Sequence, residues 1–274
     1  MGIVFAVISG KGGVGKTTTS ANLAIGTAKE GKKTVVVDFD IGQRNLDMIL
    51  GLENRVVYDI TNVMDKEATL KQALIKDKKV DNLYFLAASQ TKDKSVLDKD
   101  RVKELVDELK KEFDYIFLDS PAGIESGFEH TILYADNVIV VVNPEVSSIR
   151  DADRVIGLVD AKSQKAKEGK EIEKLLIINR IDPELIKKGE MISSSDILDI
   201  LSIKLIGKVP EDKRVIDASN TGKPVILNKE SQAGAAYERI AKRLCGQKVD
   251  FVDVETPKDK GFIEKLAGIF KWVG

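Results

Sequence analysis

Near its start the chain carries Gly10-Lys11-Gly12-Gly13-Val14-Gly15-Lys16-Thr17-Thr18, which matches the phosphate-loop pattern G-x-x-x-x-G-K-[ST]. An apolar run at residues 3–8 precedes this loop and predicts a buried strand, and residues 17–30 follow it with helical apolar spacing. This order places backbone N–H groups and a helix N-terminus against a phosphate chain, which favours a ligand site over a plain glycine-rich turn. The loop therefore predicts a nucleotide site in which Lys16 binds the β- and γ-phosphates and Thr17 binds magnesium.

The overall composition limits the classes of protein to which the chain can belong. Its 274 residues are 43% hydrophobic, enough for a sizeable core, and a formal net charge of -1 offers no general attraction to nucleic acid. A single cysteine and a single histidine, Cys245 and His130, exclude a disulfide within the chain and a Cys/His metal cluster. No signal sequence precedes the first strand, and no apolar run approaches the ~20 residues of a membrane span, so we expect a cytoplasmic protein.

Apolar segments alternate with amphipathic helical segments along most of the chain. This alternation is typical of a mostly parallel central sheet with helices on both faces. Together with the phosphate loop, it predicts an α/β protein with the three-layer fold of P-loop NTPases. Residues 138–142 are almost all valine and isoleucine, so they should form a central strand buried on both faces. We expect further strands at residues 34–39, 82–87, 115–118, 175–178 and 205–209, and helices at residues 100–112, 148–167 and 232–244.

Three carboxylates follow two of the predicted strands. Asp38 and Asp40 come at the end of the second strand, and Asp119 ends a later one. In an open parallel sheet the ligand lies beyond the carboxyl ends of the strands, where these side chains and the glycine loop emerge together. Asp38 and Asp119 suit a magnesium site, and Asp40 suits the orientation of an attacking water. Lys11, a second lysine inside the loop, suits the neutralisation of charge that develops during hydrolysis. The expected catalytic residues are therefore Lys11, Lys16 and Asp40.

The segment from Lys11 to Thr18 resembles the deviant Walker A box of the MinD/ParA family of ATPases. The likeness continues through residues 38–47, 119–125 and 143–148 to the C-terminal segment, covers essentially the whole chain, and is greatest to the MinD branch. It departs from the family pattern at Gln43, where a more apolar residue is expected. The resemblance implies an ATPase with ATP and Mg²⁺ as its ligands.

The resemblance also implies how such a site works. Two chains dimerise face to face around two ATP molecules, and Lys11 of each reaches the nucleotide of the other. Asn179, Pro210 and Asp212, from the loops after the last two strands, are implied to form the base pocket. The implied function is a switch that helps to place the division site, with MinE stimulating hydrolysis and MinC inhibiting assembly of the division ring. The implied nucleotide-binding set is Gly10, Lys11, Gly12, Gly13, Val14, Gly15, Lys16, Thr17, Thr18, Asn179, Pro210 and Asp212.

The composition of the chain changes near its end. We expect an ATPase domain at residues 1–246, a charged linker at 247–260 and a terminal helix at 261–274. This helix is amphipathic with basic flanks, a form that lies in a membrane interface, although an apolar face can also pack back onto a domain. The resemblance favours the anionic inner face of the cell membrane, reached by a cytoplasmic protein when ATP is bound. The expected membrane residues are Phe262, Ile263, Leu266, Ile269, Phe270, Trp272 and Val273.

Related proteins with other functions are alternatives to this interpretation. A DNA-partition or flagellar-number ATPase shares the loop, but a partition protein needs a basic DNA-binding surface and does not need the terminal helix. A reductase with a four-iron cluster bridging its dimer needs two cysteines per chain, which Cys245 alone cannot supply. A metabolic ligase needs a second group of polar residues for its substrate, and none is evident. We therefore expect the membrane-associated ATPase, without nucleic acid as a partner.

Overall fold

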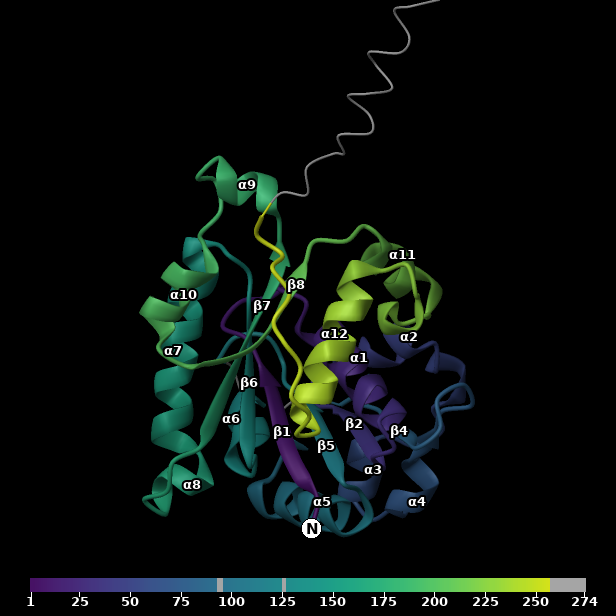
Figure 1. The fold of residues 1–274 in the computed structure, drawn as a ribbon. Coiled ribbons are helices and arrows are strands. Elements are labelled where there is room, and N and C mark those ends of the chain that lie inside the picture. Colours follow the sequence, from purple (N-terminus) through teal and green to yellow (C-terminus); the bar gives the residue numbers. More distant parts are fainter. Residues whose placement is uncertain (93–95, 125–126, 257–274) are drawn as a thin grey trace, which may run out of the picture.

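A computed structural model describes residues 1–92, 96–124 and 127–256 of the chain (Figure 1). The helix expected at residues 261–274 therefore lies outside the described residues. Within them, eight strands form a single sheet in the order β3-β4-β2-β5-β1-β6-β7-β8, and only the edge strand β3 runs antiparallel to its neighbour. The strands are β1 (Ile3–Ile8), β2 (Thr34–Asp38), β3 (Ile75–Lys76), β4 (Leu83–Leu86), β5 (Tyr115–Asp119), β6 (Asn137–Val142), β7 (Glu173–Ile181) and β8 (Lys204–Pro210).

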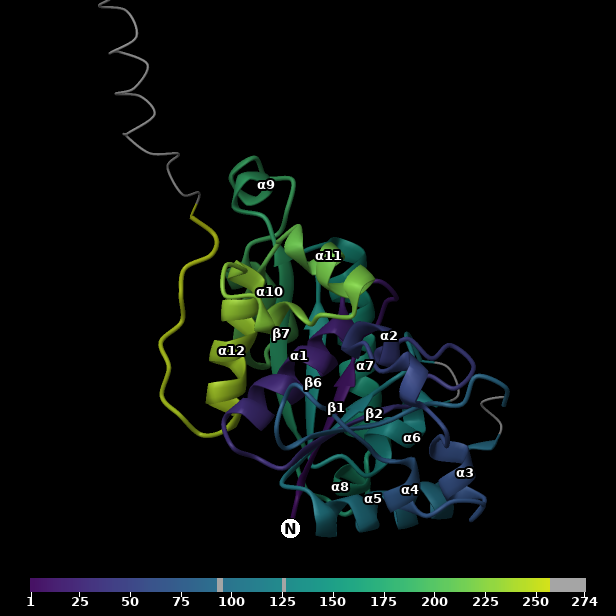
Figure 2. The ribbon, with the colours of Figure 1, turned by 90° about the vertical axis from the view of Figure 1, so that its right-hand side faces the viewer.

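Helices cover both faces of the sheet and make a three-layer structure, which confirms the predicted fold class (Figures 1 and 2). On one face lie α3, α5, α6, α7 and α10, and on the other lie α1, α2 and α12. The helices are α1 (Lys16–Lys29), α2 (Leu46–Leu50), α3 (Ile60–Met64), α4 (Leu70–Ala73), α5 (Lys99–Glu112), α6 (Phe128–Leu133), α7 (Val146–Lys162), α8 (Gln164–Lys167), α9 (Pro183–Lys187), α10 (Ser194–Leu201), α11 (Arg214–Thr221) and α12 (Gln232–Leu244).

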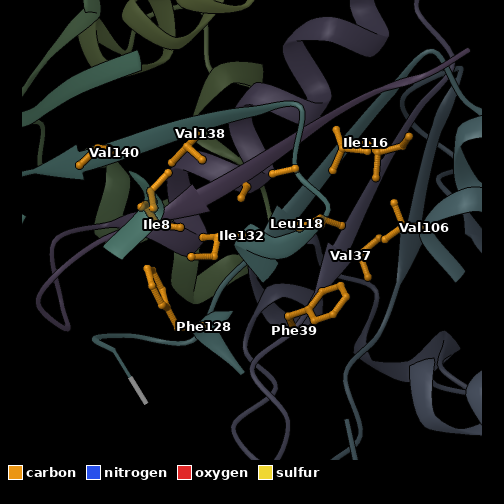
Figure 3. Close-up of a cluster of buried hydrophobic side chains, with 14 of the residues drawn as sticks. Ile8, Val37, Phe39, Val106, Ile116, Leu118, Phe128, Ile132, Val138 and Val140 are labelled. Carbon is orange, nitrogen blue, oxygen red and sulfur yellow. The ribbon is translucent and has the colours of Figure 1, made fainter. Parts of the chain in front are cut away.

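The two cores follow from the alternation of side chains along each strand. Because successive residues of a strand point to opposite faces, alternate residues of β1 enter different clusters, Val4, Ala6 and Ile8 on one side and Phe5 and Val7 on the other. Figure 3 shows part of the first cluster, where side chains of β1 and β6 meet those of α6. As predicted, β6 is a central strand buried on both faces.

Two local features differ from the sequence-based expectation. The helix expected at residues 148–167 is divided into α7 and α8 by Ser163, whose extended backbone ends the first helix while its hydroxyl accepts a hydrogen bond from the Ala166 N–H at 3.2 Å and caps the second. The strand β3 was not expected, because two residues are too few to show an alternating pattern, although the partner strand β4 follows closely in the sequence.

The order of the strands brings the candidate site together. β1 lies between β5 and β6, and β2 lies on the far side of β5, so the chain leaves the carboxyl ends of β1, β2 and β5 at one edge. The connection after β1 leads towards β2 and the connection after the neighbouring β6 leads the other way, towards β7. A crevice forms at the carboxyl edge where the direction reverses in this way. No helix in the described residues is long and apolar enough to cross a membrane.

Candidate nucleotide site

The glycine loop joins β1 to α1 as the motif predicted. Gly15 has φ +90°, a left-handed conformation that favours glycine, and a side chain there would also meet the Asn179 amide at 2.4 Å. At Gly10 a side chain would meet the backbone of Asp151 in α7 at 2.3 Å. The two outer glycines of the loop are therefore required by close packing, while the N–H groups before α1 stay available for an anion.

Lys16 lies on the floor of the site. Its side chain is only 7% exposed, and its ammonium group approaches the Asp119 carboxylate at 3.3 Å. The same carboxylate oxygen accepts a hydrogen bond from the Ser20 hydroxyl, one turn further along α1, at 2.7 Å. A buried charge is stable only when it is paired, so Asp119 and Lys16 hold each other in place beneath the loop. This arrangement fixes a positive charge where a phosphate chain would lie.

Asp38 stands beside Asp119, since the two residues are in register on the neighbouring strands β2 and β5. Its carboxylate accepts hydrogen bonds from the backbone N–H groups of Asp40, Asn45 and Leu46, and the last of these begins α2. Burial, and then the negative charge of Asp119, raise the pKa of Asp38 to about 7 despite these hydrogen bonds. A cation bound beside Asp38 and Asp119 would favour the ionised form of Asp38.

The described residues do not form a ready-made metal centre. No three histidine, cysteine, aspartate or glutamate side chains in this part of the chain come close enough to hold a metal ion. The half-buried Thr17 lies at the start of α1, and Asp38 and Asp119 offer their carboxylates at the same edge. This donor set fits Mg²⁺, which commonly binds few protein oxygens and takes the rest of its ligands from phosphates and water. Asp40 is half-buried at the turn after β2.

Lys11 lies at the rim of the loop and faces a different element. Its ammonium group contacts the Glu145 carboxylate at 3.1 Å and donates to the Ser147 hydroxyl at 3.1 Å, both at the beginning of α7. The Lys11 and Glu145 side chains are 44% and 52% exposed, so water screens this pair. The second lysine of the loop is therefore held weakly and outside the floor of the site.

The residues expected to form the base pocket come together only in part. Asn179, at the end of β7, donates from its amide to the Val14 carbonyl at 2.8 Å and so supports the loop. Pro210 ends β8 and lines a cavity of about 480 Å³ with Asp182 and residues from α12. Asp212 is nearly buried, and its oxygens accept hydrogen bonds from the Ser231 hydroxyl and the N–H groups of Ala233 and Arg214. Its carboxylate therefore anchors the start of α12 to this loop.

Three residues of the site were not singled out from the sequence. Ser20 supports Asp119 from one turn beyond the loop motif, where the pattern makes no demand. Glu145 and Ser147 hold Lys11, although they lie 134 and 136 residues further along the chain. Only the matching stretch at 143–148 hinted at them, because it follows a central strand and so emerges at the same edge of the sheet.

The strand order, the glycine loop and the lysine buried beside two strand-end carboxylates define a P-loop nucleoside triphosphatase fold. The AAA domain family matches residues 2–172. The septum site-determining protein MinD of Helicobacter pylori is 59% identical over 98% of this chain and 100% of its own length. The chain therefore belongs to the MinD family, a group of P-loop ATPases, and the resemblance noted in the sequence is confirmed.

Solved structures agree with this assignment. A MinC:MinD cell division protein complex from Aquifex aeolicus matches with a TM-score of 0.83 and 45% identity, covering 92% of this chain and 99% of that one. MinD from Pyrococcus horikoshii, complexed with Mg-ADP, matches with a TM-score of 0.77 and 28% identity over 89% of this chain and 96% of that one. The fold is thus shared across chains of quite different sequence.

Proposed function

We propose that this chain is an ATP-driven switch that dimerises, attaches to the membrane and helps to place the cell-division site. The observation that carries the proposal is the contrast between the two lysines of the loop. Lys16 is buried with Asp119 and serves the phosphates of its own chain, whereas Lys11 is exposed at the rim, where a one-chain site has no need of it. A surplus charge at the rim makes sense if it acts on the nucleotide of a second copy.

The geometry supports a definite division of labour during hydrolysis. The loop N–H groups and Lys16 bind the phosphates, and Thr17, Asp38 and Asp119 hold Mg²⁺ directly or through water. When bound there, Mg²⁺ would neutralise charge on the phosphate oxygens. Asp40 orients the attacking water, because it lies furthest along the turn after β2. Once the dimer has formed, the partner's Lys11 leaves Glu145 and stabilises the charge that develops on the transferred phosphate, as an arginine finger does.

Several exposed apolar side chains lie at the nucleotide edge and support a contact face there. Val146 begins α7 beside Glu145 and is 64% exposed, and Ile124, in the segment after β5, is also exposed. Met48 on α2 and Ile216 on the neighbouring α11 are exposed as well. Large apolar side chains gathered around one edge are typical of a surface that a partner covers. They support dimerisation through the edge that carries Lys11.

The proposed membrane binding and partner proteins are supported by the family relationship and by the C-terminal sequence. A helix at 261–274 with an apolar face and basic flanks suits an anionic lipid surface, but a single short helix binds only marginally. Two such helices on one dimer raise the avidity by ~10²–10⁴-fold, so ATP-dependent dimerisation turns attachment on and hydrolysis turns it off. The solved MinC:MinD complex supports a MinC-like division inhibitor as a partner, and we propose MinE as the activator of hydrolysis.

The decisive experiment measures oligomeric state and binding to liposomes of anionic phospholipid, with ATP and with ADP. We expect a dimer that sediments with liposomes in ATP and a monomer that stays in solution in ADP. A variant without residues 257–274 should still bind ATP and dimerise but should stay in solution. A full-length protein that sediments with DNA and not with liposomes in ATP would instead identify a partition ATPase.

A further inference from the structure

After α12 the chain turns back and runs along the domain towards the nucleotide edge (Figures 1 and 2). We call residues 247–256 the strap; they form neither helix nor strand. α12 ends at the amino edge of the sheet. There the hydroxyl of Tyr115, the first residue of β5, donates to the Leu244 carbonyl at 3.0 Å. From there the strap runs back along α12 and β8 (Figures 1 and 2), and its last residue lines the same cavity as Pro210 at the carboxyl edge.

One arginine holds the strap near its beginning. The Arg243 guanidinium, in the last turn of α12, donates to the carbonyls of Val249 and Asp250 in the strap at 2.9 and 2.7 Å. It also donates to the Ile206 carbonyl of β8 at 3.0 Å and lies 4.0 Å from the centre of the Phe251 ring. A planar group with a fixed fork of donors can make these contacts at once, and a lysine cannot. Arg243 thus joins α12, β8 and the strap.

The far end of the strap is held separately. Lys208 of β8 pairs with Glu255 at 2.8 Å, and both side chains are only 21% exposed. The Asp253 carboxylate accepts hydrogen bonds from the N–H groups of Glu255 and Thr256, which fixes a turn at the end of the strap. Val254 packs against the core cluster beneath it. The strap is therefore bound at both ends, although it has no regular hydrogen-bonded structure.

We propose that the strap is a positioning device that makes the C-terminal segment leave the domain at the nucleotide edge, with Arg243 as its clamp. The inference rests on the proposed function, in which residues 257–274 bind lipid and the nucleotide edges of two chains meet. With the strap bound, both terminal segments start beside the dimer contact. With the strap released, each starts from Gly246, at the opposite edge of the sheet.

The expected size of the effect follows from tether lengths. Ten released residues behave as a flexible chain with a root-mean-square span of roughly 17 Å, so the point from which the lipid-binding segment departs becomes poorly defined. The second helix of the dimer then finds the membrane at a lower effective concentration. We expect release of the strap to weaken ATP-dependent liposome binding by about tenfold. ATP affinity and the dimerisation constant are measured in the same variants, because the strap lines the cavity that also contains Pro210. A tenfold loss of liposome binding supports positioning where both of these stay unchanged.

The test compares two ways of releasing the strap. Arg243→Ala and Arg243→Lys remove the clamp from α12, while the double change Asp253→Ala with Glu255→Ala frees the far end and leaves α12 intact. The strap ends near α9, since Pro183 at the start of α9 lines the same cavity as Thr256. Spin labels at Thr256→Cys and Lys187→Cys, in a Cys245→Ser background, report whether it still does so in the variants. Co-sedimentation with liposomes of anionic phospholipid in ATP, together with the dimerisation constant, gives the functional result.

The charges of these variants separate positioning from simple attraction to anionic lipid. Lys242→Ala removes the same charge from the same helix but touches no strap residue through its side chain, and it should bind lipid nearly as the unchanged protein does. The strap-side variant loses two negative charges and would bind lipid more tightly by attraction alone, so a tenfold loss points to position.

We expect a broad label distance and a tenfold loss of binding in all three strap variants. Unchanged lipid binding with a broadened distance would overturn the proposal, and so would a narrow distance in the variants. Lipid binding that survives removal of residues 257–274 would instead overturn the proposed function.

Discussion

The floor and the rim of the phosphate loop carry the same pair of residue types, lysine with carboxylate, in opposite surroundings. On the floor, Lys16 and Asp119 are 7% and 2% exposed, so each depends on the other. On the rim, Lys11 and Glu145 are 44% and 52% exposed, and such pairs are worth about 0–1 kcal/mol. Burial therefore makes one lysine a permanent part of the site and leaves the other free to change partners.

Removal of the floor lysine should have the largest effect. Lys16→Ala takes away the charge for the phosphates and leaves the buried Asp119 without its ion-pair partner, a loss that typically costs ~3–5 kcal/mol. We expect ATP binding, measured by calorimetry, to fall by more than about 100-fold, since a charge-assisted contact of this kind is worth several kcal/mol. Lys29→Ala, at the exposed end of the same helix, is the matched control and should bind ATP normally. Near-normal ATP binding by Lys16→Ala would show that the floor is only structural.

The carboxylate proposed to orient water should affect chemistry and leave binding intact. Asp40→Ala should slow hydrolysis by about 10²–10⁴-fold, the usual contribution of such a group. ATP binding should persist, so the dimer should accumulate in ATP and Mg²⁺ by sedimentation velocity. Asp81→Ala, which removes an exposed carboxylate at the amino edge of the sheet, serves as control. If Asp40→Ala stayed monomeric with ATP, the role given to this residue would be wrong.

In contrast to Lys16, the rim lysine Lys11 should contribute little to ATP binding and strongly to dimerisation. Lys11→Ala should change ATP affinity by less than about threefold, because the exposed pair contributes little. Dimerisation and activator-stimulated hydrolysis should fall by about 10³-fold, the range found for charges supplied by a partner subunit. Lys11→Arg keeps the charge and should retain part of the activity. Equal losses in ATP binding and dimerisation would place Lys11 on the floor with Lys16.

The smallest effect is expected from a substitution of Glu145, the ion-pair partner of Lys11. Glu145→Gln removes the charge that holds Lys11 in the monomer, and we expect thermal stability to change by about 0.5 kcal/mol or less. Dimerisation with ATP should strengthen by about two- to fivefold, since Lys11 no longer has to leave an ion pair. Glu129→Gln, which also faces a lysine at the surface, provides the comparison. A weaker dimer would mean that Glu145 itself contributes to the interface.

Prediction from the sequence succeeded where the signal was local. The loop, its flanking strand and helix, and the two strand-end carboxylates are each visible in short windows, and the structure places them at one edge as the strand pattern implied. The sequence reasoning did not separate Asn179, which supports the loop, from Asp212, whose oxygens are occupied by the start of α12. The sequence pattern placed both in loops after strands, whereas Asn179 lies within β7 and Asp212 follows β8, and their hydrogen bonds separate their roles.

The order of amino acids was sufficient for the class of fold, the phosphate loop and the family, because strand periodicity and a loop motif are properties of neighbouring residues. The different environments of Lys11 and Lys16 required the folded chain. Their partners lie 134 and 103 residues away, and the degree to which each ion pair is buried depends on which strands become neighbours. The course of the strap is a property of the same kind. The charged, irregular sequence of the strap does not determine the direction in which it runs. Contacts with α12 and β8 fix that direction.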